Sequence, residues 1–546
     1  MKKQNYLISL SLICCLFLAQ LSSAQTFEEH TIKFPMLHEY DASYELNPMG
    51  DQGVLVLRNR YGGEKKNIVS DIELTYIKTD FRKGWVKNIQ VENYGQIISK
   101  GFDKEYAYYL MRQGEINYRV LRVRLADGKH KVYYYKNVEK SEIDYFLVED
   151  NICFLGGHAM GLPFAARWDL ENDNRKILSS VHQIKGGIVC MEWDKDADML
   201  TLVLKAEMSS DHRGVYINDY SIDGNLDKQY FEEIQRDYNY QSFRPYHNSK
   251  GELIMMGTYG LGGVTEQSQG VYSMKLTGNG YRIKPKFYDF SFFNNYLSHL
   301  DPKKREQLEN KFANKKKKGK VMPLNISLMP HKLQFMNGQV MFIMEEVSFI
   351  YPYTKDAKFA SEGFFTKADA PTMKNFAQDY RNEIIKKGEY IPYGLSEEKM
   401  YSGAPFPLEC KYKRALACGF DFETGEMIWD NTYVTRNHKN SLPIESIQAY
   451  ADHKKVAFIH VSRDSFFYKV SKRLEYKNAC EVNVYKDYSP SNTIDKYTNG
   501  GISHWYANHF IHTGTKKVSS RLSGNNESEN YFFLTCLSYS NRNLSK

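Results

Sequence analysis

A strand–loop–strand unit recurs in this chain about every fifty residues, and this repeat restricts the possible folds more than any other feature of the sequence. In its clearest copy, an apolar strand at residues 253–257 is followed by a loop, a second strand at residues 271–276 and the turn Asn279-Gly280. Apolar runs bounded by Gly and Asn turns are typical of antiparallel hairpins. A period of this length is typical of the four-stranded blade of a β-propeller.

The unit can be traced eight times along the chain. Its first strands are predicted near residues 53–57, 106–111, 151–155, 200–204, 253–257, 340–344, 456–460 and 510–513. Its second strands are predicted near residues 72–78, 118–125, 164–170, 215–222, 271–276, 415–422, 480–485 and 531–537. We therefore predict an all-β fold, a β-propeller of eight blades. Seven blades, or a pair of two-sheet sandwiches, are the alternatives.

The last predicted pair of strands is not followed by an outer strand. The segment at residues 30–34, near the N-terminus, has the composition to supply it. Such a strand would close the ring and cover an otherwise exposed sheet edge.

Two segments interrupt the repeat, and both are predicted to be helical insertions. The first lies near residues 286–330, where Asp301 is placed to cap a helix with Pro302 at its first position. The second lies near residues 354–412, within the sixth blade, and contains apolar residues at helical spacing. Insertions in repeat proteins usually lie on one face, which is often the binding face.

Residues 1–24 have the three parts of a secretory signal peptide, namely Lys2-Lys3, an apolar run over residues 6–19 and small residues at 22–24. The run is shorter than the roughly 20 residues of a membrane span, so an uncleaved anchor is the less favoured alternative. We predict an exported protein whose mature part, residues 25–546, is a single propeller domain without a transmembrane segment. The periplasm or cell envelope is the favoured location, and the extracellular space is the alternative.

The net charge of +8 is concentrated in one place. The segment at residues 299–320 holds nine Lys or Arg and three acidic residues, so the rest of the mature chain is close to neutral. This distribution argues against a nucleic-acid partner. Lys315, Lys316, Lys317 and Lys318 are the candidate partner-binding residues, for a lipid head group, an acidic polysaccharide or an acidic protein surface. A solvated helix end is the alternative interpretation.

We recognise no pattern in the sequence that is typical of catalysis or metal binding, and we assign no catalytic, cofactor-binding or metal-binding residue. His504, His509 and His512 are close in sequence, but residues 509 and 512 of one strand point to opposite faces. Cys410 and Cys418 could form a disulfide, and the sequence leaves their state open.

Tyrosines are unusually frequent in the predicted strands. Those at residues 106–109 and 133–135 could offer stacking surfaces to a sugar or a peptide. Because aromatic residues are common in strand cores, we predict that these tyrosines are buried.

Residues 415–429 resemble one repeat of the pyrroloquinoline-quinone-type propellers. The resemblance is carried by Asp421, the turn Thr424-Gly425 and Trp429. It implies a propeller in which the tryptophan packs between blades. It does not imply quinone binding, and no cofactor is expected.

A closed propeller presents rigid loops around its axis, which suits binding more directly than catalysis. We interpret the chain as a non-enzymatic exported binding or scaffold protein. Its architecture resembles that of the scaffold subunit of the bacterial outer-membrane barrel-assembly machinery, but it lacks that subunit's lipid anchor. This resemblance implies an accessory subunit of an outer-membrane transport, secretion or assembly complex, with a protein partner. The alternatives are a polysaccharide-active hydrolase or lyase and a glycan-binding surface protein.

Overall fold

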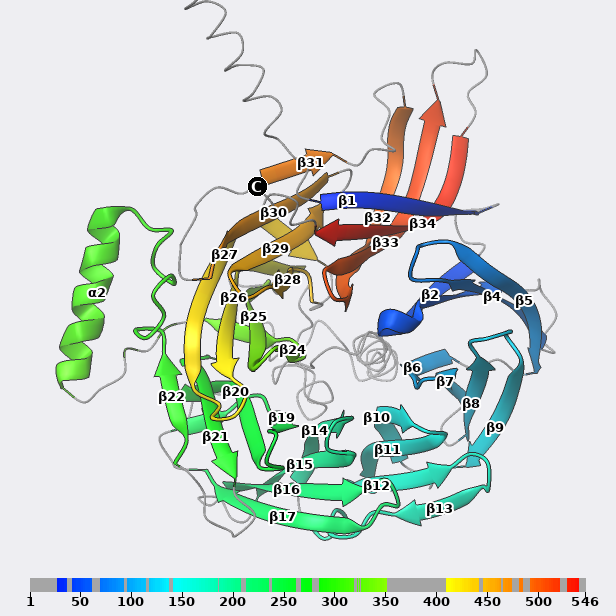
Figure 1. Ribbon diagram of the computed structural model, residues 1–546, viewed down its shortest axis with the longest axis horizontal. Coiled ribbons are helices and arrows are strands. Elements are labelled where there is room, and N and C mark those ends of the chain that lie inside the picture. Colours follow the sequence, from blue (N-terminus) through cyan, green and yellow to red (C-terminus); the bar gives the residue numbers. More distant parts are fainter. Residues whose placement is uncertain are drawn as a thin grey trace, which may run out of the picture.

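Eight antiparallel β-sheets are arranged around a common axis, which confirms the predicted eight-bladed propeller (Figure 1). The structure is a computed structural model that describes residues 27–539 without residues 37–41, 61–68, 93–95, 114–116, 137–140, 185, 208–212, 235–237, 262–266, 277–283, 319–321, 323, 325, 351–408, 441–444, 463–464, 474–480, 485–491 and 521–527. Seven blades follow one another along the chain, and the eighth combines the last three strands with the first.

From the innermost strand outward, the first four blades consist of strands that are consecutive in the sequence. The first two blades contain β2 (Ala42–Pro48), β3 (Val54–Arg60), β4 (Val69–Ile77) and β5 (Lys83–Glu92), then β6 (Gln96–Phe102), β7 (Tyr106–Gln113), β8 (Asn117–Arg124) and β9 (His130–Lys136). The third and fourth contain β10 (Ser141–Glu149), β11 (Ile152–Ala159), β12 (Leu162–Asp169) and β13 (Asn174–Ile177), then β14 (Gly186–Asp194), β15 (Met199–Glu207), β16 (Arg213–Ser221) and β17 (Leu226–Glu233).

The fifth and sixth blades each have an inner strand that is split into two short pieces. They contain β18 (Tyr238–Tyr240), β19 (Arg244–His247), β20 (Leu253–Leu261), β21 (Gly270–Leu276) and β22 (Lys286–Asp289), then β23 (Ser327–Pro330), β24 (Gln334–Met336), β25 (Gln339–Ile350), β26 (Glu409–Asp421) and β27 (Met427–Asn440). The seventh contains β28 (Gln448–Ala451), β29 (Lys455–Ser462), β30 (Ser465–Lys472) and β31 (Glu481–Val484), and the eighth contains β32 (Asn492–Tyr506), β33 (His509–Ser520), β34 (Ser528–Tyr539) and β1 (Phe27–Pro35).

All eight predicted first strands correspond to the second strand of a blade, and seven of the predicted second strands correspond to the third. The prediction at residues 480–485 is wrong. That segment contains β31, the outer strand of the seventh blade, and the strand that pairs with β29 is β30. The alternating apolar and polar residues of 480–485 suit an outer strand with one exposed face as well as a middle strand, so the pattern alone did not separate the two.

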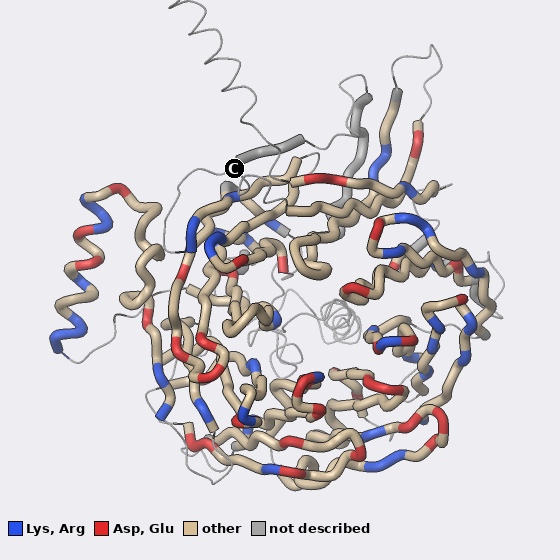
Figure 2. Tube along the Cα trace, in the orientation of Figure 1, with Lys and Arg blue, Asp and Glu red and all other residues tan. Residues whose placement is uncertain are grey.

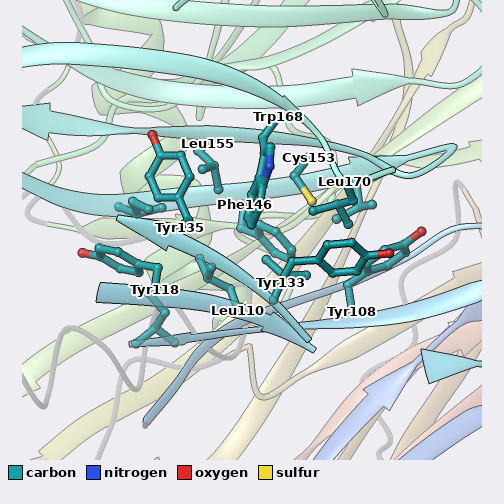
Figure 3. Close-up of a cluster of buried hydrophobic side chains, with 14 of the residues drawn as sticks. Tyr108, Leu110, Tyr118, Tyr133, Tyr135, Phe146, Cys153, Leu155, Trp168 and Leu170 are labelled. Atoms are coloured by element: carbon teal, nitrogen blue, oxygen red, sulfur yellow. The ribbon is translucent and has the colours of Figure 1, made fainter. Parts of the chain in front are cut away.

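The core consists of eight hydrophobic clusters, each of which joins one blade to the next around the ring. Between the second and third blades, Tyr118 and Tyr133 pack with Phe146 and Trp168 (Figure 3). Because a middle strand has a blade on each side, both of its faces are buried, and β20 is buried at every position except its last. The outer strand β13 is exposed along its whole length.

The predicted burial of the clustered tyrosines is largely confirmed. Tyr108 and Tyr109 are fully buried, and Tyr133 and Tyr135 are nearly so. Figure 3 shows Tyr108, Tyr133 and Tyr135 in their cluster. Tyr134 is 61% exposed, but the guanidinium of Arg119 lies 5.1 Å from the centre of its ring. One face of this ring is therefore engaged in a cation–π contact.

The N-terminal strand closes the ring as predicted. β1 pairs with β34 without interruption from Phe27 opposite Tyr539 to Pro35 opposite Tyr531. Phe27 is fully buried, and its ring packs edge-on against those of Phe466 and Tyr468 in the seventh blade. The strand therefore completes the eighth blade and also joins it to its neighbour.

The first insertion contains one helix, α2 (Pro302–Lys317), which stands outside the ring beside the fifth and sixth blades (Figure 1). Asp301 caps it, since its side chain accepts a hydrogen bond from the backbone N–H of Lys304 at 3.0 Å. The helix fills only the middle of the predicted range, whose ends belong to β22 and β23. The second predicted insertion lies outside the described residues, except for residues 409–412, which begin β26 and are not helical.

The segment that resembles a quinone-type repeat forms a tight turn and an inter-blade contact. The Oδ1 atom of Asp421 accepts hydrogen bonds from the backbone N–H groups of Glu423 and Thr424, and Gly425 adopts a φ of +68°. Trp429 packs in the cluster between the sixth and seventh blades, and its ring covers Gly419 of β26.

We expect Gly419→Ala to destabilise the protein by about 1–3 kcal/mol, because forcing a methyl group into a packed site displaces its neighbours. The added Cβ would lie 2.0 Å from Nε1 of Trp429. The measurement is the denaturant midpoint of unfolding. Gly187→Ala is the matched control, since a Cβ on this strand glycine would meet nothing within 4 Å. Equal midpoints for both variants would contradict the prediction.

Candidate functional site

The four predicted partner-binding lysines lie at the C-terminal end of α2, away from the ring. Lys315, Lys316 and Lys317 form its last turn, and Lys318 caps it by donating its backbone N–H to the carbonyl oxygens of Lys315 and Lys316. All four residues are exposed. The Nζ atom of Lys316 lies 4.3 Å from the centre of the Phe292 ring, which is itself 44% exposed.

The carboxylates of α2 do not neutralise this end of the helix. Arg305 pairs with Glu309 at 2.7 Å, and Lys304 pairs with the cap Asp301 at 3.5 Å, so both ion pairs lie nearer the start of the helix. Among the residues that the structure describes, Lys315–Lys318 form no ion pair. Figure 2 shows the basic residues along α2 and at its end. The negative end of the helix dipole favours cations here, whether or not a partner binds.

A second group of charged residues lies on the innermost part of four successive blades. Arg244 of the fifth blade lies 3.3 Å from Glu192 of the fourth and donates from Nε to the carbonyl oxygen of His331 at 2.9 Å. The Nε2 atom of His331 lies 2.7 Å from Glu345 of β25, and its Nδ1 lies 3.7 Å from Glu445, just before β28.

This chain of contacts serves to hold blades together. Glu345 also accepts the backbone N–H groups of Ser446 and Ile447 at the start of the seventh blade, at 2.7 and 3.1 Å. Burial opposes a charge on His331, but the carboxylates of Glu445 and Glu345 outweigh it and raise the pKa of His331. These hydrogen-bonded contacts join the fourth, fifth, sixth and seventh blades to one another.

The three histidines that are close together in the sequence lie in separate environments in the structure. The Nε2 atom of His504 lies 2.7 Å from the carbonyl oxygen of Ala507, and the Nδ1 atom of His509 lies 2.6 Å from Oγ of Ser538. His512 is fully buried on the other face of β33, where burial lowers its pKa to about 3. These histidines do not converge on one point.

A group that sequence reasoning missed lies at the start of β10 in the third blade. Glu142, Asp144 and His158 each offer one ligand atom, and these atoms lie within 4.8 Å of one another. The two carboxylates are two residues apart in the sequence, but His158 lies on the next strand. Only the register of β10 against β11 brings it to them, and that register is not readable from the sequence.

Cys410 and Cys418 are not joined by a disulfide. Both lie on the extended strand β26, where their cross-strand partners are Asn440 and Asp430. Eight residues of a strand span about 26 Å, far beyond the reach of a disulfide.

Comparisons with known proteins give no family. No family model matches the chain, and no curated protein matches it. The resemblance of residues 415–429 to quinone-type repeats is therefore not confirmed as a family relationship. No helix in the described part of the chain has both the length and the apolar composition to cross a membrane.

Among solved structures, the chain is similar to the WD40 domain of SCAP from fission yeast, with 8% identity over 94% of this chain and 98% of that one and a TM-score of 0.42. It is similar to the polysaccharide lyase Uly1, with 9% identity over 94% and 99% and a TM-score of 0.37. It is also similar to the β-propeller domain of the Trilobed protease from Pyrococcus furiosus, with 6% identity over 80% and 97% and a TM-score of 0.34. These values are too low for any of the three to bear on the function of this chain.

Proposed function

We propose that this chain is an exported, non-catalytic binding or scaffold protein of the cell envelope, and that the end of α2 contacts an acidic protein partner. The observation that supports the proposal is the position of Lys315–Lys318. These lysines stand outside the ring, and the described residues supply no carboxylate to pair with them. The partner we favour is a subunit of an outer-membrane transport, secretion or assembly complex.

The anchoring of α2 supports a role in binding. Its buried residue is Phe312, which packs against the apolar cluster between the fifth and sixth blades. The rest of the helix faces solvent, with a row of cations that a compact domain does not need for its own stability. A helix with this composition is suited to a complementary negative surface, which increases the rate of association as well as its specificity.

The geometry of the third blade does not support a polysaccharide hydrolase. Two carboxylates do approach each other there, as such an enzyme requires. However, the imidazole of His158 lies between them, 3.3 Å from Asp144 and 3.6 Å from Glu142. It occupies the space that a scissile glycosidic bond would need.

We expect the variant with Lys315, Lys316, Lys317 and Lys318 all changed to Gln to lose its partner. Each exposed ion pair contributes about 0.2–1 kcal/mol, so four together, about 0.8–4 kcal/mol, should reduce recovery of the partner by about fourfold or more. The measurement is quantitative mass spectrometry after mild crosslinking in the protein's own cell envelope. The melting temperature should fall only slightly, because the four lysines are exposed and lose little beyond their interaction with the helix dipole.

The matched control changes four other exposed lysines to Gln, on the outer strands β5 and β9, and so removes the same charge: Lys83, Lys87, Lys131 and Lys136. Equal loss of the partner in both variants would show that net charge matters and the position of α2 does not. Recovery of the unaltered protein as a free monomer at every crosslinker dose would contradict the scaffold role itself.

A further inference from the structure

Glu142, Asp144 and His158 are brought together by a local irregularity of the third blade. Glu142 lies directly opposite His158 in the ladder between β10 and β11. The register then shifts between Ile143 and Tyr145, so that Asp144 is the extra residue of a β-bulge. Bulges re-aim side chains, and this one carries the carboxylate of Asp144 to the side on which His158 lies.

The strands approach each other closely at this point. A Cβ on Gly157, which precedes His158, would lie 1.9 Å from the backbone carbonyl oxygen of Glu142. Only glycine permits this approach, so the backbone that carries His158 is fixed against the backbone that carries Glu142. The three side chains therefore project from a rigid hairpin, which holds a ligand set more accurately than a loop does.

One ligand atom from each side chain lies within 4.8 Å of the other two, a little farther apart than in a coordination shell. Oδ2 of Asp144 lies 3.3 Å from Nδ1 of His158, and Oε2 of Glu142 lies 3.6 Å from Nε2. Ligand atoms about 2.1 Å from one tetrahedral ion are about 3.4 Å from each other. The two contacts use different nitrogens of the ring, so the imidazole has to turn until one nitrogen faces both carboxylates before all three side chains can bind a common ion.

The carboxylate of Glu142 is also held by Arg112 of the neighbouring second blade. Nη1 of Arg112 lies 3.6 Å from Oε1 of Glu142, which leaves Oε2 directed towards His158. An outer partner of this kind fixes the geometry of a carboxylate ligand. A histidine that binds a metal is neutral, so the two carboxylates and the guanidinium then carry a net charge of −1. A divalent ion would change this to +1.

Exposure is consistent with exchange of an ion with solvent. The side chains of Glu142, Asp144 and His158 are 16%, 13% and 23% exposed, so they are shielded without being sealed. In a second group of one histidine and two carboxylates, His247 is 5% and Asp219 1% exposed, whereas Asp194 is 17% exposed.

We propose that Glu142, Asp144 and His158 bind one divalent transition-metal ion, with water completing its coordination. One imidazole and two carboxylates form a mixed nitrogen and oxygen set, which suits Zn²⁺ or Mn²⁺ better than Ca²⁺ or Mg²⁺. The inference does not depend on the proposed partner of α2, since the two sites lie on different blades.

The test is calorimetric titration of the untagged, chelator-treated protein with ZnCl₂. The expected result is one equivalent bound, with affinity reduced at least tenfold in both Asp144→Asn and His158→Gln. Asp227→Asn, which alters an exposed carboxylate on β17, is the matched control and should bind like the unaltered protein. Substitution of Co²⁺ should give d–d absorption bands that both site variants lose.

Folding of each variant is checked by its melting temperature in chelator, and Glu142→Gln replaces any variant that does not fold. Absence of stoichiometric binding to the unaltered protein would overturn the proposal. So would binding that survives all three substitutions, because the ion would then be held elsewhere.

Discussion

Deletion of residues 27–35 is expected to leave a chain that cannot form a stable monomeric ring. The deletion removes β1, and with it nine paired residues along β34 and the buried rings of Phe27 and Phe34. Loss of one such aromatic side chain from a core costs about 3–5 kcal/mol, so loss of two approaches the whole stability of an ordinary domain. The uncovered edge of β34 would also be available for intermolecular pairing. We expect aggregation in size-exclusion chromatography and no cooperative thermal transition.

A milder variant tests the same feature in a protein that still folds. Phe27→Ala should lower the free energy of unfolding by about 3–5 kcal/mol, because it opens a cavity among Phe466, Tyr468, Phe510 and Tyr539. His30→Ala, at an exposed position of the same strand, should have an effect of less than about 0.5 kcal/mol.

Complementation of the truncated chain with a peptide tests whether β1 closes the ring. A synthetic peptide of residues 27–35, added during refolding of the truncated chain, should occupy the free edge of β34 and restore a monomer by strand addition. If the truncated chain were monomeric and melted like the intact protein without the peptide, β1 would not be the element that closes the ring.

Acidification from pH 7 to pH 5 is expected to destabilise the protein by several kcal/mol. His438 and His460 lie together in the seventh-blade interface, with ring centres 4.7 Å apart. Burial lowers the pKa of His438 to about 4, and burial with the nearby His438 lowers the pKa of His460. Burial likewise lowers the pKa of His512 to about 3.

Acid lowers the free energy of unfolding because the unfolded chain takes up more protons than the folded one. An unfolded histidine has a pKa of about 6.5, so between this value and the folded pKa the unfolded chain binds more protons. The stability that these groups contribute is complete above pH 6.5 and is lost as the pH falls towards 4, by about 1–3 kcal/mol for each histidine. His247 acts in the opposite sense: burial disfavours its charge, but Asp194 and Asp219 raise its pKa to about 9, so its contribution is lost as the pH rises from 6.5 to 9.

The measurement is the free energy of unfolding between pH 5 and pH 8. His438→Leu should flatten the acid limb because it removes one of the buried imidazoles. Within the part of the chain that the structure describes, Nε2 of His438 has no hydrogen-bond partner that the change would leave unsatisfied. The exposed His453→Leu should leave the whole profile as it is. An unchanged acid limb in His438→Leu would assign the effect to other groups.

Features that depend on local sequence were predicted well. The eight blades follow from apolar strand pairs that recur about every fifty residues outside the two insertions. The start of α2 follows from Asp301 and Pro302, which act within one helical turn. The strand at residues 480–485 was assigned to the wrong position in its blade, because middle and outer strands can share one alternating pattern.

Features that depend on the alignment of separate strands could not be predicted. The group in the third blade requires the pairing of Glu142 with His158 and a bulge at Asp144, and neither leaves a recognisable mark in the sequence. The four lysines of α2 were visible as a charge run. Their placement outside the ring, without carboxylate partners among the described residues, required the structure.

The pairing of the first strand, β1, with the last, β34, also affects how the chain folds. The hydroxyls of Thr31 and Thr535 are 2.8 Å apart although 504 residues separate them in the sequence. Seven blades consist of consecutive strands and can form as soon as each segment is available, whereas the eighth has to wait for the end of the chain. Contacts of such long range slow folding, because loop closure costs entropy before any packing is gained. A circular permutant that joins residue 539 to residue 27 and opens the chain between two other blades would turn this contact into a hairpin, and the slow step would move to the new opening.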